Sequence, residues 1–215
     1  MTVPLLLGHR GARAVRQIPE NTLASFELCL KHGCDGFEFD VRLSADGHPV
    51  ICHDATTGGI EIAKTVAKSL PLPTLGNVLE QFAHRAFLDV ELKVAGVESQ
   101  TLAKLRRHPP QQGYVVSSFL PEVLTTLHDL DPAIPLGFLC ETKDQLRRWR
   151  QMPTEWVIPR SELADRDLVE PVQAAGKRIM VWTVNRADRM SEFAEWGVDA
   201  IISDETELLV RSIVT

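Results

Sequence analysis

The sequence predicts an α/β fold, a closed (β/α)8 TIM barrel, from three observations. Short apolar runs alternate with amphipathic stretches along the chain of 215 residues, with eight of each. Strict alternation of strands and helices indicates a parallel sheet, and eight such units suggest closure into a barrel. The first turn, Gly8-His9-Arg10-Gly11, lacks the GxGxxG pattern that often begins the alternative fold, a doubly wound open sheet.

Each element is predicted from its own pattern. Strands are expected where an apolar run is short, at Leu5–His9, Gly36–Val41, Ala86–Leu92, Tyr114–Ser118, Ile134–Cys140, Trp156–Pro159, Arg178–Val184 and Ala200–Ser203. Helices are expected where apolar residues recur every three or four positions, at Asn21–Lys31, Leu75–Phe82, Gln100–Arg107, Glu122–Leu130, Asp144–Gln151, Arg166–Ala175, Ala187–Trp196 and Thr206–Ile213. Glycines stand where helices should end, at Gly33, Gly113, Gly176 and Gly197.

One segment interrupts the alternation after the second strand. Asp46-Gly47 marks a tight turn, and Pro49–His53 is predicted to be an extra strand. Residues 55–73 carry little periodicity, so they are interpreted as a short insertion over one end of the barrel. Residues 1–215 show no repeat or linker and are expected to form a single domain, since this length provides one full-sized core.

Composition excludes several classes of protein. The net charge is −6, which argues against a nucleic-acid partner, whose binding needs a basic surface. No apolar segment approaches the roughly 18 residues of a membrane span, and Met1–Leu7 lacks the features of a signal peptide. The four cysteines form no CxxC pair, which indicates reduced thiols rather than a zinc site. A cytoplasmic protein without a membrane anchor is therefore expected.

The second predicted strand carries two acids in an otherwise apolar run. Side chains alternate along a strand, so Phe37, Phe39 and Val41 share one face and Glu38 and Asp40 share the other. Two buried carboxylates repel each other and lose their hydration. A divalent cation would offset both costs. The alternative is a half-exposed strand whose acids lie in water.

Other polar and aromatic residues fall near predicted strand ends, where (β/α)8 barrels carry their chemistry. They lie at the ends of the first strand, the third strand and the extra strand, and within the seventh strand. The residues are two histidines, an acid, two bases and a tryptophan: His9, Arg10, His53, Glu91, Lys93 and Trp182. Chance placement of the whole set on one rim is improbable.

These residues also admit structural interpretations. His9 could be a core histidine that bonds the backbone, and His53 could cap a turn, instead of acting in catalysis. The charged side chains could form structural ion pairs, Arg10 with Glu20 and Glu91 with Lys93. Trp182, taken by itself, fits a position in the core.

Short motifs occur in a fixed order: His9-Arg10-Gly11, Glu20-Asn21-Thr22, Glu38-Phe39-Asp40-Val41, Asp46-Gly47, His53-Asp54, Glu91-Leu92-Lys93, Ser118-Phe119 and Trp182-Thr183-Val184-Asn185. A single motif of this kind is weakly specific. The ordered set resembles the glycerophosphodiester phosphodiesterase family, and the resemblance runs from Leu6 to about Asp204.

The resemblance implies a barrel that uses a divalent cation to hydrolyse glycerophosphodiesters, such as glycerophosphocholine or glycerophosphoethanolamine, to glycerol 3-phosphate and an alcohol. It implies Glu38, Asp40 and Glu91 as ligands of one Mg²⁺ or Ca²⁺, hard cations that prefer carboxylate oxygens. It implies His9 as the general base and His53 as the general acid. The implied substrate contacts are Arg10 and Lys93 on the phosphate and Trp182 beside the glycerol.

The chain departs from the family pattern in Ala55–Pro73, which is shorter than the usual insertion after the His-Asp pair. Because this segment is expected to overhang the site, its length leaves the substrate class open. One alternative is cleavage of lysophospholipids on the same barrel, by a lysophospholipase D-like reaction or with formation of a cyclic phosphate. Another is a non-catalytic barrel that binds metal or phosphate, which the complete set of histidines and carboxylates disfavours.

Overall fold

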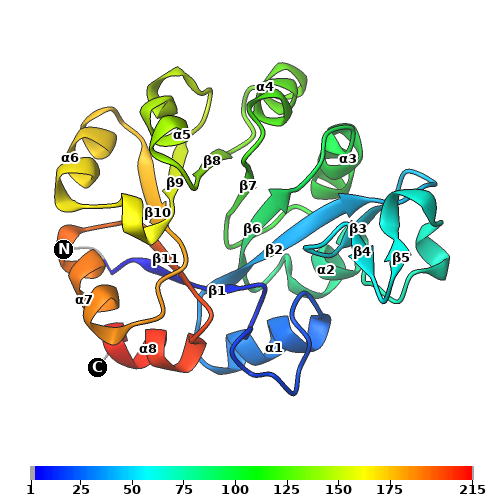
Figure 1. The fold of residues 1–215 in the computed structure, drawn as a ribbon, viewed down its shortest axis with the longest axis horizontal. Helices are drawn as coiled ribbons and strands as arrows, with labels where there is room; N and C mark the ends of the chain where they lie inside the picture. The colour runs from blue at the N-terminus through cyan, green and yellow to red at the C-terminus, as the bar shows by residue number, and fades with distance from the viewer. Residues whose placement is uncertain (1–2, 215) are drawn as a thin grey trace.

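A computed structural model describes residues 3–214, and it contains a closed barrel of eight parallel strands (Figure 1). The strands are β1 Leu5–His9, β2 Gly36–Leu43, β6 Phe87–Leu92, β7 Tyr114–Ser118, β8 Leu136–Cys140, β9 Trp156–Pro159, β10 Arg178–Val181 and β11 Ala200–Ser203. Neighbours in this order pair in parallel, and β1 closes the barrel by pairing with both β2 and β11. The predicted fold class is confirmed.

Helices follow the strands and surround the barrel, as Figure 1 shows. They are α1 Leu23–Lys31, α2 Leu75–Phe82, α3 Glu98–Arg107, α4 Pro121–Leu130, α5 Lys143–Arg147, α6 Arg166–Ala174, α7 Ala187–Trp196 and α8 Thr206–Val214. Thr22 caps α1 by accepting a hydrogen bond from the Ser25 amide. The predicted helix at 144–151 is shorter than expected, because α5 gives way to a 3-10 turn at Trp149–Gln151.

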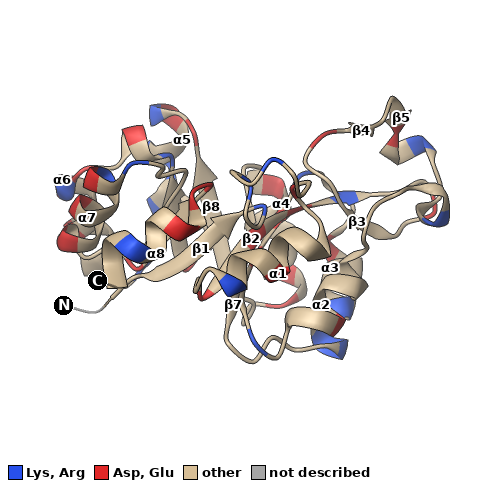
Figure 2. Ribbon diagram, turned by 90° about the horizontal axis from the view of Figure 1, so that it is seen from below, with Lys and Arg blue, Asp and Glu red and all other residues tan. Residues whose placement is uncertain are grey.

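The insertion after β2 is present and contains short elements. β3 (Pro49–Ile51) pairs antiparallel with β2, and β4 (Thr56–Thr57) pairs with β5 (Ile60–Glu61). Two 3-10 turns follow, Ile62–Lys64 and Ala67–Ser69. Figures 1 and 2 show the β4–β5 hairpin projecting from the side of the barrel at which β2 and β3 lie. The extra strand predicted at 49–53 ends two residues early, so His53 lies in a loop.

An aromatic cluster fixes the orientation of β2. The rings of Phe26, Phe37, Phe39 and Phe82 pack between this strand and helices α1 and α2, and the stacked Phe26 and Phe37 centroids lie 4.2 Å apart. Because Phe37, Phe39 and Val41 are buried on the outer face of β2, the alternate residues of this strand face the barrel interior. The half-exposed alternative for this strand is therefore wrong.

The side chains that fill the barrel interior are apolar, except for those from β2 and the strands near it. Leu7, Phe87, Val115, Trp156 and Met180 belong to one buried cluster contributed by five strands. A filled interior is typical of this fold, so a substrate can be reached only at its rim. Among residues 3–214, no helix combines the length and apolar character needed to cross a membrane.

Candidate active site

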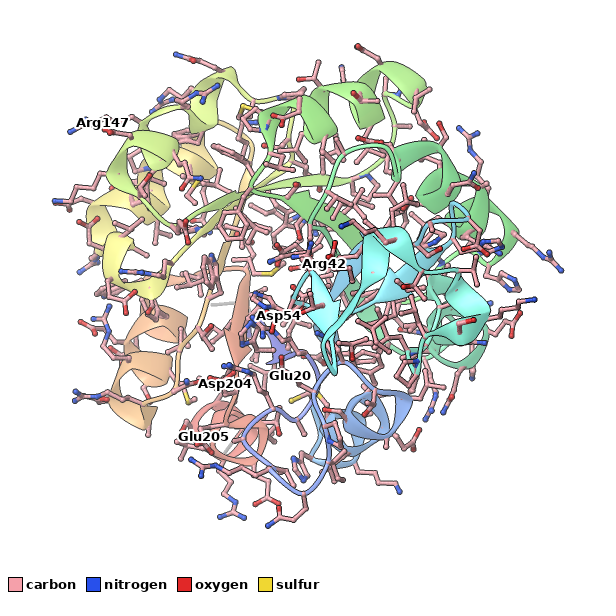
Figure 3. All side chains as sticks on the ribbon, turned by 45° about the vertical axis from the view of Figure 1, so that its right-hand side comes forward. Glu20, Arg42, Asp54, Arg147, Asp204 and Glu205 are labelled. Carbon is pink, nitrogen blue, oxygen red and sulfur yellow. The ribbon has the colours of Figure 1, made fainter. Side chains whose placement is uncertain are left out.

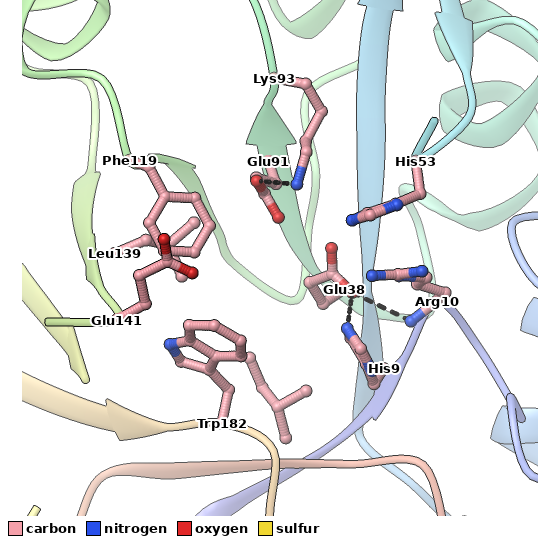
Figure 4. A pocket seen from close by; sticks show the side chains of 11 residues that line it. His9, Arg10, Glu38, His53, Glu91, Lys93, Phe119, Leu139, Glu141 and Trp182 are labelled. Atoms are coloured by element: carbon pink, nitrogen blue, oxygen red, sulfur yellow. Dashed lines mark hydrogen bonds and ion pairs between the residues drawn. The ribbon is translucent and has the colours of Figure 1, made fainter. Parts of the chain in front are cut away.

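The carboxyl ends of β1, β2 and β6 bring the predicted metal ligands and the first histidine together. Strand register sets His9 beside Glu38 and Asp40 beside Glu91. A cavity of about 170 Å³ opens here (Figure 4). Seven of the eight predicted site residues line it, namely His9, Arg10, Glu38, His53, Glu91, Lys93 and Trp182. The eighth, Asp40, is fully buried.

Three acids converge at the base of this cavity. One carboxylate oxygen from each of Glu38, Asp40 and Glu91 lies within 4.8 Å of the others, and the residues are 4%, 0% and 7% exposed. Burial raises the pKa of Glu38 well above its usual range, and the charge of Asp40 adds to the effect. The same two causes raise the pKa of Glu91 to about 8.

The donor set fits a hard divalent cation. Glu38 Oε1 is buried, and it has no hydrogen bond or ion pair within the described chain. Oxygen atoms of Asp40 and Glu91 are also buried without a well-aligned hydrogen bond, although Lys93 lies within ion-pair distance of both. Carboxylate oxygens at this spacing are the ligands that Mg²⁺ and Ca²⁺ prefer. The triad is therefore consistent with a divalent metal site.

Replacing Glu38 with glutamine tests this site. The change retains the volume of the side chain and removes one charged ligand, so we expect cation affinity to fall by at least about 10-fold. Titration calorimetry with Ca²⁺ and with Mg²⁺ measures this change. The melting temperature without cation should not fall, because the substitution relieves repulsion among buried acids. Unchanged cation affinity would show that Glu38 is a structural acid.

Two basic side chains flank the acids. Arg10 Nε lies 3.2 Å from Asp40 Oδ2, and Arg10 Nη1 lies 2.7 Å from Glu20 Oε1. Lys93 Nζ lies 2.6 Å from Glu91 Oε1 and 3.3 Å from Asp40 Oδ1. Burial acts to lower the pKa of Lys93, but Glu91 and Asp40 outweigh it and hold this pKa above its usual value. The ion pairs considered as alternatives for both basic side chains are present, and each side chain also contacts Asp40.

Asp40 is held on its other side by Asn21. The Asn21 side-chain amide donates to Asp40 Oδ2 over 2.7 Å, and Asn21 has a left-handed φ of 57°. A left-handed backbone is unfavourable for a residue other than glycine, although asparagine tolerates it better than most. Burial opposes ionisation of Asp40, yet Lys93, Arg10 and the Asn21 bond together hold its pKa below its usual value.

His9 is oriented by an acid from the last strand end. Its Nδ1 lies 2.7 Å from Asp204 Oδ1, and its Nε2 faces Glu38 Oε2 at 3.9 Å. Burial lowers the pKa of His9, although the Asp204 hydrogen bond opposes this shift. Asp204 also accepts hydrogen bonds from Arg13 and from Asn185, at 3.1 and 2.7 Å. Asp204 was not predicted from the sequence, although its place after Ser203 at a strand end was a usable signal.

His53 reaches the cavity from the loop after β3. Its Nδ1 lies 2.7 Å from Asp54 Oδ1, so Nε2 is the nitrogen left to face the site. Each histidine thus has a carboxylate at Nδ1. Figure 3 shows Glu20, Asp54 and Asp204 gathered near the centre of the view, while Arg147 lies at its edge.

Trp182 lies just beyond its strand. The prediction of a strand at 178–184 is wrong at its end, because β10 stops at Val181. Beyond Val181, pairing with the segment after β9 is reduced to one isolated parallel bridge between Arg160 and Trp182, in which the Ser161 amide donates to the Trp182 carbonyl. The indole N–H donates to the Ile158 carbonyl over 3.0 Å, and the ring contacts Phe119 edge-on at 5.5 Å. Trp182 is therefore a fixed wall of the cavity.

The sequence model of the glycerophosphoryl diester phosphodiesterase family matches residues 9–80 and 80–208. The chain belongs to this family. Its similarity to individual members of the glycerophosphodiester phosphodiesterase family extends over nearly the whole length. The glycerophosphodiester phosphodiesterase of Caldanaerobacter subterraneus subsp. tengcongensis is 27% identical over 97% of each chain. That of Bacillus subtilis is 26% identical over 95% of this chain and 84% of the relative.

Solved structures of the family have the same barrel. An Oleispira antarctica phosphodiesterase, in complex with the product sn-glycerol-3-phosphate, matches with a TM-score of 0.86 and 28% identity, over 99% of this chain and 98% of that one. The glycerophosphodiester phosphodiesterase of Thermotoga maritima matches with a TM-score of 0.85 and 23% identity, over 98% of this chain and 99% of that one. The chain is an enzyme of the glycerophosphodiester phosphodiesterase family.

Proposed function

We propose that this enzyme hydrolyses small glycerophosphodiesters, such as glycerophosphocholine and glycerophosphoethanolamine, to glycerol 3-phosphate and an alcohol. The buried triad of Glu38, Asp40 and Glu91 beside two histidines in one cavity carries the proposal. The triad would hold one Mg²⁺ or Ca²⁺. When bound, such an ion polarises a phosphoryl oxygen and stabilises the charge that develops in the transition state.

Two basic side chains, Arg10 and Lys93, position the phosphate of the substrate. Lys93 is held protonated by Glu91 and Asp40, and Arg10 is held by Asp40 and Glu20. Both side chains line the cavity and can contact the unesterified phosphate oxygens. Because acidic residues already hold each of these basic side chains in place, the side chains lose little conformational entropy when substrate binds.

His9 acts as the general base. Asp204 holds its Nδ1–H, so the unprotonated Nε2 faces the cavity, and burial favours the neutral ring that a base requires. Nε2 takes a proton from the attacking water as the new phosphorus–oxygen bond forms.

His53 acts as the general acid. Asp54 fixes its Nδ1, which leaves Nε2 to carry the proton that the departing oxygen receives. The bond from phosphorus to the alcohol oxygen breaks, the alcohol leaves neutral, and glycerol 3-phosphate remains. Several head groups should be accepted, because the fixed partners lie on the glycerol 3-phosphate half.

Soluble diesters are expected to be better substrates than lysolipids. The cavity of about 170 Å³ is below the roughly 300 Å³ at which pockets for drug-sized ligands begin. We expect kcat/KM for glycerophosphocholine to exceed that for long-chain lysophosphatidylcholine by at least about 10-fold. Choline release measures both reactions in one assay. Faster release from the lysolipid would favour the alternative, a lysophospholipase D-like or cyclic-phosphate-forming enzyme.

A further inference from the structure

An unpaired carboxylate lies in the wall of the cavity across from His53. Glu141 directly follows β8, and its exposed carboxylate has no hydrogen bond or ion pair among the described residues. Figure 4 shows Glu141 on the same wall as Phe119 and Trp182, while His53 and Arg10 occupy the opposite side. The proposed mechanism gives Glu141 no role.

The position of the general acid indicates which half of the substrate meets this wall. In the proposed function, on which this inference rests, His53 protonates the departing alcohol, so the head group must lie on the His53 side. The phosphate lies between, beside Lys93 and Arg10. The glycerol then extends toward the wall that contains Glu141.

One aromatic ring of this wall already has a cation beside it. Lys93 Nζ already lies 5.6 Å from the centroid of the Phe119 ring, within the range of a cation–π contact. A second cation on that ring would be repelled by the first. An uncharged polyol avoids this repulsion, since its C–H groups pack on aromatic faces and its hydroxyl groups turn toward the acid.

We propose that Glu141 is the residue that selects a free glycerol, by accepting hydrogen bonds from its two hydroxyl groups. An ionised carboxylate accepts without donating, and both glycerol hydroxyls are donors. A lysophospholipid has one of these hydroxyls esterified. It would therefore lose a donor and place ester oxygens, which only accept, against the carboxylate. Glu141 thus favours soluble glycerophosphodiesters over lysolipids.

The test uses three substrates with one head group: glycerophosphocholine, short-chain 1-hexanoyl-lysophosphatidylcholine and 1-propyl phosphocholine. These substrates carry two, one and no free glycerol hydroxyl groups, respectively. Glu141→Ala should lower kcat/KM for glycerophosphocholine by about 10- to 100-fold. The value for 1-propyl phosphocholine should change less than about 3-fold, since that substrate has no hydroxyl to lose. Glu141→Gln, which keeps the shape and loses the charge, should fall between wild type and Glu141→Ala.

Glu162→Gln is the matched control. Glu162 is an exposed acid on the loop after β9, its carboxylate pairs with Arg160 at 2.9 Å, and it does not line this cavity. All three kcat/KM values should stay within about 2-fold of wild type in this variant. An equal loss on the three substrates in Glu141→Ala would overturn the proposal. The proposal would also be overturned if the loss of kcat/KM in Glu141→Ala depended on the head group. Comparing glycerophosphoglycerol with glycerophosphocholine measures this dependence.

A binding measurement separates this inference from the proposed function. By calorimetry, the wild type should bind sn-glycerol 3-phosphate about 10- to 100-fold more tightly than propyl phosphate. Glu141→Ala should bind the two monoesters equally. Equal binding by the wild type would contradict the role of Glu141 whether or not diesters are hydrolysed. Selective binding without hydrolysis of any diester would contradict the proposed function and support the role of Glu141.

Discussion

Replacing His53 with alanine is expected to cost about 10²- to 10⁴-fold in kcat/KM on glycerophosphocholine. Choline leaves as a basic alkoxide that needs a proton, and His53 is the group proposed to supply it. The same variant should lose less than about 10-fold on the 4-nitrophenyl ester of glycerol 3-phosphate, because nitrophenolate leaves without protonation. Steady-state kinetics with both substrates, under saturating cation, measure this difference.

His9→Ala provides the comparison. The proposed base acts on the attacking water, so its loss should be severe on both substrates, by about 10²- to 10⁴-fold. Equal losses on the two substrates in His53→Ala would contradict the two-histidine mechanism. Rescue of His9→Ala by the nitrophenyl substrate would instead show that the acid and base roles are reversed.

Removing the divalent cation is expected to reduce turnover by at least about 10³-fold without unfolding the barrel. Apart from His9, whose neutral form burial favours, the three carboxylates have only Lys93 and Arg10 within ion-pair distance in the described chain to offset their charge. Substrate phosphate would add a further negative charge to this cluster. The aromatic cluster around Phe26 and the helices that surround the barrel do not depend on the metal site. The far-ultraviolet circular dichroism spectrum should therefore not change. The melting temperature should rise when Mg²⁺ or Ca²⁺ is added, because the ion binds the folded state.

The parts of the site that local sequence rules describe were predictable. Alternation along one strand placed Glu38 and Asp40 opposite Phe37 and Phe39 without reference to any other part of the chain. The general rule that barrel chemistry lies at strand ends then brought Glu91 to the same rim. The first step needs only the two-residue alternation of side chains along a strand, and the second needs only the fold class. The sequence pattern supplies both.

Other parts depend on contacts that no local pattern encodes. Asp204 meets His9 across 195 positions of sequence, and only closure of β1 against β11 brings them together. Glu141 is an exposed glutamate after a strand, a common occurrence without meaning until a cavity wall surrounds it. The end of β10 was missed because Trp182 and Val184 continue the apolar run, although regular pairing stops at Val181 and Trp182 makes only an isolated bridge.

Phosphorus NMR of glycerophosphocholine during turnover tests the central claim most directly. The protein is first incubated with excess chelator, and Mg²⁺ or Ca²⁺ is then added in excess over the chelator. We predict that the diester signal persists in chelator and is replaced by that of glycerol 3-phosphate once the cation is present. Formation of glycerol 3-phosphate at an undiminished rate in excess chelator, or of a cyclic phosphate as the final product, would contradict metal-dependent hydrolysis of glycerophosphodiesters at this site.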